Sequence, residues 1–351
     1  MKITHVINSL ATGGAERLVV ELSHHGRRLG HDVEVVLLAE LPGAPGRAAQ
    51  AYGVPVKVLG SSRWDPRLIG RIRSATASSD IVHVHLFPAL YLAARLPGPK
   101  VFTEHSTHNR RLGRRRYDRA ERWSYDGYDR VIAISSGVAS VLERHLHHIG
   151  SSTPVVRVPN GISDAFFNVE RICPPDRLRL LCVGSLTPVK QHSLALEAMR
   201  WLPDATLDIA GSGPLRKQLE SKIDELGLRD RVKLLGTVDD LPSVLKDRDI
   251  LLMTSKYEGF SLVAAEAHAT GMPVIGPNVT GLNEVVLNGV SGLLYQQPIA
   301  KEIANLILRA AEPGTYDRLS AGAQSNATRF DMATCFSANL DVYRSVLAAK
   351  R

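Results

Sequence analysis

Two glutamates in the stretch SKYEGFSLVAAE, residues 255–266, have a spacing that could bind one ligand. The stretch follows an apolar run and enters a helical pattern near Leu262, which would place Glu258 at the helix mouth and Glu266 about two turns inside. A buried carboxylate is costly unless it is paired, so the pattern favours a ligand with hydroxyls at both ends. The alternative is a capping Glu258 with a solvated Glu266.

Glycine turns follow two other apolar runs. Gly13 and Gly14 precede one helical pattern, and Gly211 and Gly213 precede another. Such turns let backbone amides at a helix N-terminus approach a phosphate, although they are also common as plain strand-to-helix connections. A dinucleotide fingerprint would need a third glycine where Arg216 stands, so an oxidoreductase is disfavoured and Arg216 becomes a candidate phosphate ligand.

Metal sites are not expected. Asp247-Arg248-Asp249 has the spacing of a metal-bound diphosphate site, but it precedes a strand-like run and would lie at the wrong end of a sheet. The histidines at 145, 147 and 148 lack the HExxH pattern or a cysteine partner. His105 ends the apolar run KVFTE, and from the residues alone it is a solvated or core histidine.

The elements that must position these residues form two series. Short apolar runs alternate with helix-length segments, which is typical of parallel sheets in an α/β fold. The first series covers 2–7, 33–38, 54–59, 80–85, 100–105, 130–135 and 155–159, and the second covers 178–184, 206–211, 231–236, 249–255, 273–276 and 292–295.

A chain of 351 residues is long enough for about two domains. The turn-rich segment 159–176, with the pair Pro174-Pro175, separates the two series. We therefore predict doubly wound domains over 1–165 and 177–330, and a C-terminal helix over 331–351 that could cross back to the first domain. Facing domains of this kind bind ligands in a cleft at the carboxyl ends of their strands.

The composition and the distribution of apolar residues limit the cellular location that we expect for the protein. The three cysteines are widely spaced, which excludes a disulfide framework and favours a reducing, cytoplasmic compartment. The first ten residues lack the apolar run of a signal peptide, and no apolar stretch near 18 residues occurs. The protein is expected to be soluble or peripheral on the inner face of a membrane.

The net charge of +8 is concentrated in RRLGRRRYDRAER, residues 110–122, where seven arginines face two acids. At helical spacing Arg111, Arg115, Arg119 and Arg122 share one face. Such a face could bind anionic lipid or a phosphorylated acceptor, and a solvated surface helix is the equal alternative. Nucleic acid is disfavoured, because aromatic residues are only 5% of the chain and no binding module occurs.

The stretch EGFSLVAAE resembles the E-x7-E motif of the retaining glycosyltransferases of family 4, which have the GT-B fold of two Rossmann-like domains. Further segments agree in order and spacing over about residues 1–295. They are GGAE at 13–16, TEHS at 103–106, VIAIS at 131–135, VPNGI at 158–162, VGSLTPVK at 183–190, AGSGPL at 210–215, LLGTV at 234–238 and GMPVIG at 271–276.

The resemblance implies roles for individual residues. Glu258 and the amides of Gly259 and Phe260 would hold the hydroxyls of the donor sugar, and Glu266 would bind the ribose. Lys190 and the helix start would neutralise the leaving diphosphate, and His105 would position the transferred sugar. The remaining donor-binding positions implied are Gly13, Gly14, Ser185, Gly213, Arg216, Ser261, Leu262 and Val263.

One position departs from the family. An arginine is common where this chain has Ser185, five residues before Lys190, and lysine does not reproduce the bidentate phosphate contact of a guanidinium. Arg216 could compensate, the donor could bind more weakly, or activity could be impaired.

The expected function is therefore transfer of a hexose or N-acetylhexosamine, with retention and without a metal or other cofactor, from a nucleotide diphosphate sugar. A uridine diphosphate sugar is favoured over a guanosine diphosphate sugar. The acceptor is a hydroxyl of a glycan, a polyprenyl-linked intermediate or a small molecule, as in polysaccharide biosynthesis. The alternatives are a catalytically silent sugar-nucleotide-binding protein and a GT-B epimerase or phosphorylase.

Overall fold

The computed structural model describes residues 1–11, 13–40, 43–107, 109, 111–170 and 178–350. The chain divides into two compact units, which we call unit 1 (Met1–Ile162 with Phe330–Arg351) and unit 2 (Ser163–Arg329). Residues 171–176 of the predicted linker 159–176 lie outside the described residues. The C-terminal segment, predicted as a separate helix, is part of unit 1.

Unit 1 contains a parallel seven-stranded sheet in the order β3-β2-β1-β4-β5-β6-β7. Each strand overlaps one of the runs predicted from the first series. The strands are β1 (Lys2–Ile7), β2 (Asp32–Leu37), β3 (Val56–Val58), β4 (Ile81–His85), β5 (Lys100–Glu104), β6 (Arg130–Ala133) and β7 (Val155–Arg157).

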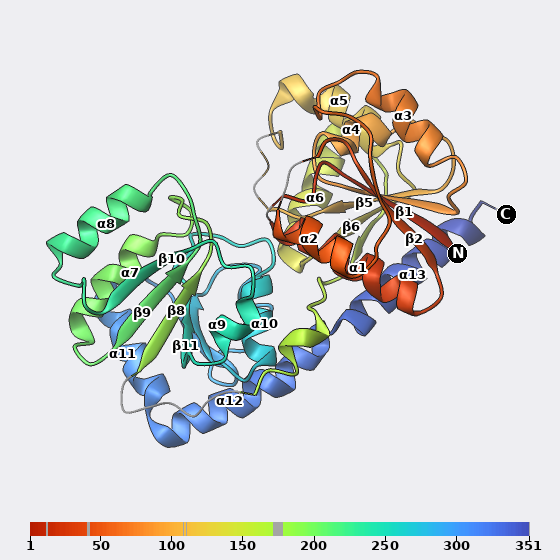
Figure 1. The fold of residues 1–351 in the computed structure, drawn as a ribbon. Coiled ribbons are helices and arrows are strands. Elements are labelled where there is room, and N and C mark those ends of the chain that lie inside the picture. Colours follow the sequence, from red (N-terminus) through yellow and green to blue (C-terminus); the bar gives the residue numbers. More distant parts are fainter. Residues whose placement is uncertain (12, 41–42, 108, 110, 171–177, 351) are drawn as a thin grey trace. The chain divides into compact units, whose positions relative to one another are not determined.

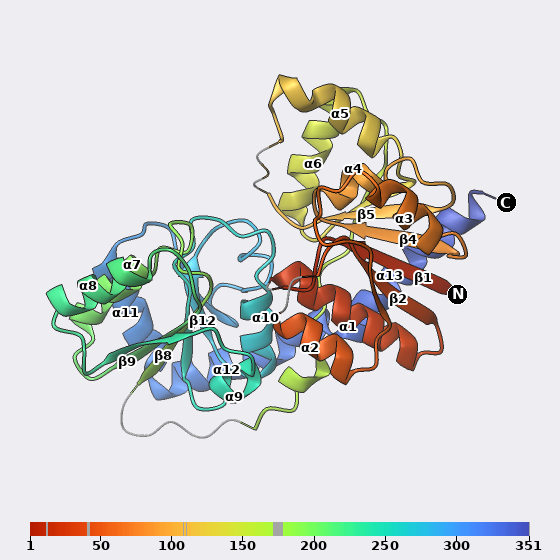
Figure 2. The same ribbon diagram turned by 45° about the horizontal axis from the view of Figure 1, so that its top comes forward.

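Helices cover both faces of this sheet, as Figures 1 and 2 show. One face carries α1 (Gly14–Arg28), α2 (Ala44–Ala51) and α13 (Met332–Ala348), and α1 packs against both of the others. The other face carries α3 (Leu68–Ala75), α4 (Ala89–Ala93), α5 (Arg115–Tyr125) and α6 (Ser136–Ile149).

Local signals explain where several helices begin and end. The hydroxyl of Ser135 accepts a hydrogen bond from the Val138 amide at the start of α6, and Gly150 ends the helix in the left-handed conformation. Asp331 accepts a hydrogen bond from the Thr334 amide at 2.6 Å and starts α13. Phe336 and Tyr343 of α13 then pack into the same core cluster as Ile3 and Val101 of the sheet.

Unit 2 contains a parallel six-stranded sheet in the order β10-β9-β8-β11-β12-β13. Each of its strands overlaps one of the runs of the second predicted series. They are β8 (Arg179–Val183), β9 (Thr206–Ala210), β10 (Val232–Gly236), β11 (Ile250–Leu252), β12 (Val274–Pro277) and β13 (Gly292–Tyr295).

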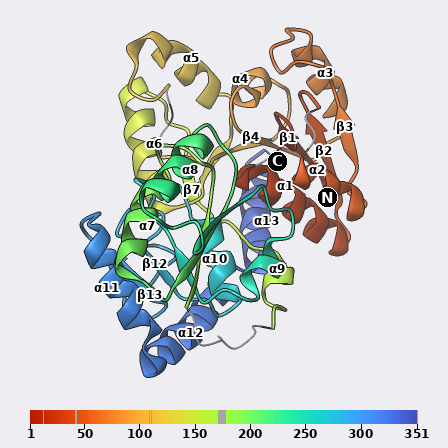
Figure 3. The same cartoon turned by 60° about the vertical axis from the view of Figure 1, so that its left-hand side comes forward.

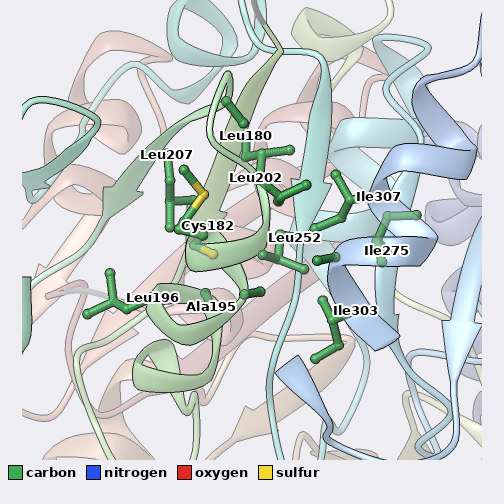
Figure 4. Close-up of a cluster of buried hydrophobic side chains, with 14 of the residues drawn as sticks. Leu180, Cys182, Ala195, Leu196, Leu202, Leu207, Leu252, Ile275, Ile303 and Ile307 are labelled. Carbon is green, nitrogen blue, oxygen red and sulfur yellow. The ribbon is translucent and has the colours of Figure 1, made fainter. Parts of the chain in front are cut away.

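The helices of unit 2 again lie on both faces of the sheet (Figure 3). One face is covered by α7 (His192–Ala198), α8 (Arg216–Glu225) and α11 (Ala300–Ala311), and the other by α9 (Leu241–Leu245), α10 (Leu262–Ala269) and α12 (Pro313–Ala327). Figure 4 shows the core on the first face, where Leu180 and Cys182 of β8 meet Ala195 of α7 and Ile303 and Ile307 of α11.

Both sheets reverse their strand order beside their first strand. The reversal lies between β1 and β4 in unit 1 and between β8 and β11 in unit 2. Open α/β sheets bind ligands outside the carboxyl ends of strands at such a point. Two Rossmann-like units of this topology confirm the predicted α/β fold class.

Candidate functional site

The switch point of unit 2 holds an ion pair formed by two of the predicted residues. Lys190 lies in the loop after β8, and its Nζ is 2.7 Å from Oε1 of Glu258 in the loop after β11. The Glu258 side chain is about as buried as a core residue, whereas 24% of the Lys190 side chain remains exposed. A cation and a carboxylate with access to solvent are thus held together where a ligand would reach both.

Backbone contacts fix these two loops to each other. The Thr254 hydroxyl donates to the carbonyl of Lys190 at 2.8 Å, and the Lys256 amide donates to the carbonyl of Val189 at 2.8 Å. Gly281 closes the other side of the Glu258 loop, since a Cβ there would lie 2.6 Å from the Glu258 carbonyl oxygen. The pair is therefore positioned by main-chain contacts and does not depend on flexible side chains alone.

Glu266 lies on α10 and is only 2% exposed. The helix begins at Leu262, so Glu266 is a little more than one turn inside it, and the predicted depth of two turns is wrong. The helix starts where it was predicted, and the error lies in the count, because the four residues from Leu262 to Glu266 make about one turn. Gly259, Phe260 and Ser261 precede the helix, and the Ser261 hydroxyl contacts Sδ of Met253 at 3.3 Å. Leu262 and Val263 form the first turn of the helix, as predicted.

The glycines after β9 serve close backbone packing. A Cβ on Gly213 would lie 2.5 Å from the Leu186 carbonyl oxygen, and one on Gly211 would lie 1.9 Å from that of Gly184. The Leu186 amide donates to the Ser212 carbonyl at 2.9 Å. The loops after β8 and β9 therefore lie against each other beside the ion pair.

The side chains of two predicted phosphate ligands make polar contacts within their own loop or helix. Ser185 is exposed, with its Oγ 3.4 Å from Oγ1 of Thr187. Arg216 begins α8, pairs with Glu220 one turn later at 2.8 Å, and lines a groove between α8 and β10. Within the described chain Arg216 makes no ion pair with Glu258, so the structure gives it no part in this cluster.

The D-x-D triplet is engaged in structural ion pairs. Asp249 directly precedes β11 and accepts hydrogen bonds from the backbone amide of Arg179, at 2.7 Å, and from its guanidinium. Arg248 pairs with both Asp247 and Asp208. The triplet thus ties β8, β9 and β11 together at their amino ends, away from the loops that hold Lys190 and Glu258.

In unit 1 the turn after β1 places Gly13 and Gly14 at the start of α1. Gly14 is exposed, and Gly13 has an extended backbone against the Glu16 side chain. Burial raises the pKa of Glu16. Thr12 of this turn lies outside the described residues.

His105 directly follows β5 and is partly buried. Its Nε2 lies 3.2 Å from Nδ1 of His85 at the end of β4, and burial lowers the pKa of His105 to about 4. Glu104 accepts hydrogen bonds from the amides of His105 and Ser106, which fixes the backbone at this point. A neutral imidazole at the carboxyl edge of the sheet is the result.

The loop after β4 contains residues that the sequence analysis did not identify. Leu86 has a left-handed backbone (φ 64°), and Asn8 at the end of β1 donates from Nδ2 to the Phe87 carbonyl at 2.7 Å. The exposed rings of Phe87 and Trp64 meet edge to face, with centroids 5.7 Å apart. The only signal in the sequence was Phe87-Pro88 directly after a strand-like run, which does not distinguish this turn from others.

The arginine face predicted over 110–122 is partly wrong. Gly113 has a left-handed backbone (φ 72°) and α5 begins at Arg115, so Arg111 is not on the helix. Arg111 is buried at 6% exposure, pairs with Glu104 and Glu121, and lies over the Phe87 ring at 4.9 Å. Of the predicted face, Arg115, Arg119 and Arg122 are exposed on α5, together with Arg116 and Trp123. Arg110 lies outside the described residues.

No helix in the described part of the chain is both long and apolar enough to span a membrane.

Sequence profiles of two known families match adjoining parts of the chain. Residues 12–166 match "Glycosyltransferase Family 4" and residues 168–325 match "Glycosyl transferases group 1". A glycogen synthase of Mycobacterium tuberculosis is 28% identical over 99% of this chain and 84% of its own length. A D-inositol 3-phosphate glycosyltransferase of Streptomyces bingchenggensis is 30% identical over 64% of this chain and 54% of its own length.

Solved structures share the fold over nearly the whole chain. HepE of Anabaena, in complex with UDP and glucose, has a TM-score of 0.86 at 22% identity and covers 98% of this chain and 100% of its own. A sucrose-phosphate synthase of Thermosynechococcus elongatus has a TM-score of 0.82 at 21% identity, over 99% of this chain and 100% of its own. At this identity the likeness establishes the architecture alone.

Proposed function

Because this chain belongs to the family 4 type of GT-B glycosyltransferases, which use nucleotide-sugar donors, we propose that it is a retaining, metal-independent hexosyltransferase. The observation that supports the proposal best is the Lys190–Glu258 pair at the switch point of unit 2. A nucleotide diphosphate sugar carries anionic phosphates beside neutral hydroxyls, and this pair offers a cation and a hydrogen-bond acceptor side by side.

Each partner then has one task. Lys190 binds the diphosphate and stabilises the charge that develops on it as the bond to the sugar breaks. Glu258 accepts hydrogen bonds from sugar hydroxyls, as charged acceptors do strongly. Glu266, buried on α10, accepts from the ribose hydroxyls, and the N-terminus of α10 adds favourable dipoles near the phosphate.

Retention follows if the acceptor attacks from the side the diphosphate leaves. The bond from the sugar's anomeric carbon to the phosphate oxygen breaks, a bond to the acceptor oxygen forms on the same face, and the acceptor proton passes to the departing phosphate. No protein base is required, and His105, whose pKa burial lowers to about 4, would be a weak base; its role is to position the sugar. The product's anomeric configuration, read by proton NMR, tests retention directly.

The nucleotide is proposed to be uridine diphosphate, since HepE binds UDP and UDP-glucose. Calorimetric titration with uridine and guanosine diphosphates, with EDTA present, tests the base and the independence from metal together. Saturable binding of uridine diphosphate alone is expected. Binding that requires added Mg²⁺ would contradict the metal-independent site.

Turnover of the sugar derivative tests the pair itself. Glu258→Gln should lose most of its activity, whereas Glu225→Gln, which removes an exposed carboxylate from α8, should keep it. Equal activity of the two variants would remove Glu258 from the sugar site. Analysis of products formed without an acceptor distinguishes transfer from epimerisation.

The alternative function is a catalytically silent protein that binds sugar nucleotides, and the observation that favours it is Ser185 in place of the usual arginine. The exposed position of Ser185 leaves room for a longer side chain, so Ser185→Arg should add a phosphate contact and tighten donor binding. If both the natural protein and Ser185→Arg bind the donor but transfer no sugar to any acceptor, the silent protein is the better description.

The acceptor is proposed to be a glycan, polyprenyl-linked or small-molecule hydroxyl bound by unit 1. The exposed arginines of α5, with Trp123 at 50% exposure, favour a docking face for anionic lipid. Liposome flotation should show binding that a triple change of Arg115, Arg119 and Arg122 to Gln abolishes.

The matched control removes the same charge from unit 2, where Lys217, Lys233 and Lys256 are exposed. Flotation lost equally in both triple variants would mean that net charge alone is responsible. No flotation of the natural protein would remove the membrane role and favour a soluble acceptor in a cytoplasmic setting.

A further inference from the structure

Four histidines of unit 1 gather on one face of the central strands. His5 of β1 pairs in register with His83 of β4, and His85 lies two residues further along, so its side chain points to the same face. His105 follows the neighbouring strand β5. His5, His83 and His85 are almost completely buried, and His105 is the member that reaches solvent.

Three of these rings form a hydrogen-bonded chain. Nδ1 of His5 is 3.1 Å from Nε2 of His85, and Nδ1 of His85 is 3.2 Å from Nε2 of His105. His83 stands outside the chain, since its two nitrogens lie 2.6 Å from the hydroxyls of Tyr343 and Thr103. The chain therefore runs from the core to His105 at the sheet edge.

Each ring in the chain is neutral near pH 7. Burial lowers the pKa of His5 to about 3 and holds that of His85 well below its usual value. A neutral imidazole has one N–H and one acceptor nitrogen. If His85 donates to one neighbour it must accept from the other, so both hydrogen bonds point in the same direction along the chain.

The direction of the two hydrogen bonds follows from His5, the ring at the buried end of the hydrogen-bonded chain. Nε2 of His5 is fully buried and has no hydrogen-bond partner among the described residues. If the chain ran inward, His5 would accept at Nδ1 and carry an unpartnered N–H at Nε2. Orphaned buried N–H groups are rarer than orphaned acceptors, so His5 donates to His85 and His85 donates to His105.

We propose that His5 and His85 are positioning residues that fix His105 with its proton on Nδ1 and its Nε2 occupied. His105 then offers a hydrogen-bond donor to a hydroxyl oxygen of the transferred sugar and is unable to act as a base through Nε2. The sugar contact rests on the proposed function; the fixed proton position does not.

The proton position can be read directly by NMR. Long-range ¹H–¹⁵N correlation spectra of the full protein labelled with ¹⁵N-histidine separate protonated from unprotonated ring nitrogens, and His105→Asn identifies the His105 signals. The natural protein should show a protonated Nδ1 and an unprotonated Nε2. His5→Phe and His85→Phe should give mixed signals.

Two further variants separate the chain from general packing. His5→Asn retains an amide donor near Nδ1 and should restore the single tautomer. His83→Phe removes an equally buried ring that is outside the chain, and should leave the His105 signals unchanged. A protonated Nε2 of His105 in the natural protein, or unchanged His105 signals in His5→Phe, would contradict the proposed hydrogen-bonded chain of histidines.

Kinetics tests the sugar role separately. His85→Phe and His5→Phe should each lower turnover severalfold while the affinity for uridine diphosphate, bound by unit 2, stays within twofold. His5→Asn, which retains a donor, should keep the turnover of the natural protein. If the natural protein shows the expected tautomer but His85→Phe has unchanged turnover, the sugar contact is wrong and the fixed proton position of His105 is still supported. Complete inactivity of the natural protein would count against the proposed function, and the NMR result would still decide the chain.

The alternative role of these rings is to bind a metal ion, since ligand nitrogens of His5, His83 and His85 lie within 4.8 Å of one another. Titration with Zn²⁺ followed by the same spectra tests it. Joint shifts of all three rings at one equivalent would overturn the proposal, and unchanged spectra would support the hydrogen-bonded chain.

Discussion

Each unit contains a cation held against a carboxylate, but the two clusters differ in how completely their charges are satisfied. Arg111 in unit 1 is buried, pairs with Glu104 and Glu121 and lies over an aromatic ring. Lys190 in unit 2 is partly exposed, and its one ion-pair partner among the described residues is Glu258. A buried cluster of this kind holds its groups to one another, whereas a cluster with hydrogen-bonding capacity near solvent can exchange partners with a ligand.

The residues at the carboxyl edges of the two sheets also differ in charge. Unit 1 presents neutral histidines at its switch point, and unit 2 presents formal charges. Because the strand orders are alike, the difference arises from the residues at the strand ends and in the loops, and not from the topology. The comparison predicts which perturbations act on stability and which act on activity.

Acid should have the largest effect, and mainly on unit 1. The pKa values of buried His5, His83 and His85 are lower in the folded protein than in the unfolded chain, so the unfolded chain binds more protons below about pH 6.5. Stability present above that pH is therefore lost as the pH falls toward 4. Each of these histidines costs up to about 2 kcal/mol at pH 5.

Hydrogen exchange at pH 7 and pH 5 would measure this loss strand by strand. Amides of β1 and β4 should lose more protection than those of β8 and β11, although unit 2 also contains His192 and His268 with lowered pKa values. Equal loss in both sheets would contradict the concentration of the effect in unit 1.

Arg111→Met should destabilise the protein by about 3–5 kcal/mol, because it leaves Glu104 and Glu121 buried with less compensation. Urea unfolding measures the change. The control is Arg122→Met, which removes an exposed pair with Asp126 and should cost at most about 1 kcal/mol. A similar, small effect of both variants would show that the unit 1 cluster is not structural.

Lys190→Met should act on turnover instead. Loss of a preorganised group that stabilises developing charge lowers kcat by about 10²–10³-fold, while the change in unfolding free energy should be smaller than for Arg111→Met. Lys256→Met, an exposed lysine on the neighbouring loop, provides the control and should keep its activity. If Lys190→Met lowers stability as strongly as Arg111→Met and leaves turnover intact, the contrast between the clusters fails.

Glu266→Gln should have the smallest of these effects and should act on affinity. Hydrogen bonds to a charged group contribute about 1.5–3 kcal/mol, so uridine diphosphate should bind roughly 10–100-fold more weakly. The 2′,3′-dideoxy analogue lacks the ribose hydroxyls and should bind both forms alike. An equal loss for both nucleotides would place Glu266 away from the ribose.

Much of the fold could be predicted because the spacing of apolar residues and the turn residues between elements are local properties of the sequence. Every predicted apolar run overlaps a strand, and the parallel order follows from their alternation with helices. The loop containing Glu258 and the helix containing Glu266 were also predictable, since a strand, a glycine turn and a helix follow one another directly. Whether Glu266 is buried or solvated was not, because its burial depends on elements distant in the sequence, such as α12, which packs against α10.

The sequence by itself determined the two α/β sheets, the family and the positions of the candidate ligand-binding loops. Only the tertiary structure decided which polar residues meet: Lys190 with Glu258 across 68 positions, Arg111 with Glu121, and His5 with His85 across 80. Helical spacing placed Arg111 on a surface, and a single left-handed turn at Gly113 moved it into the core. Long-range pairing depends on strand order and register, which no local pattern specifies.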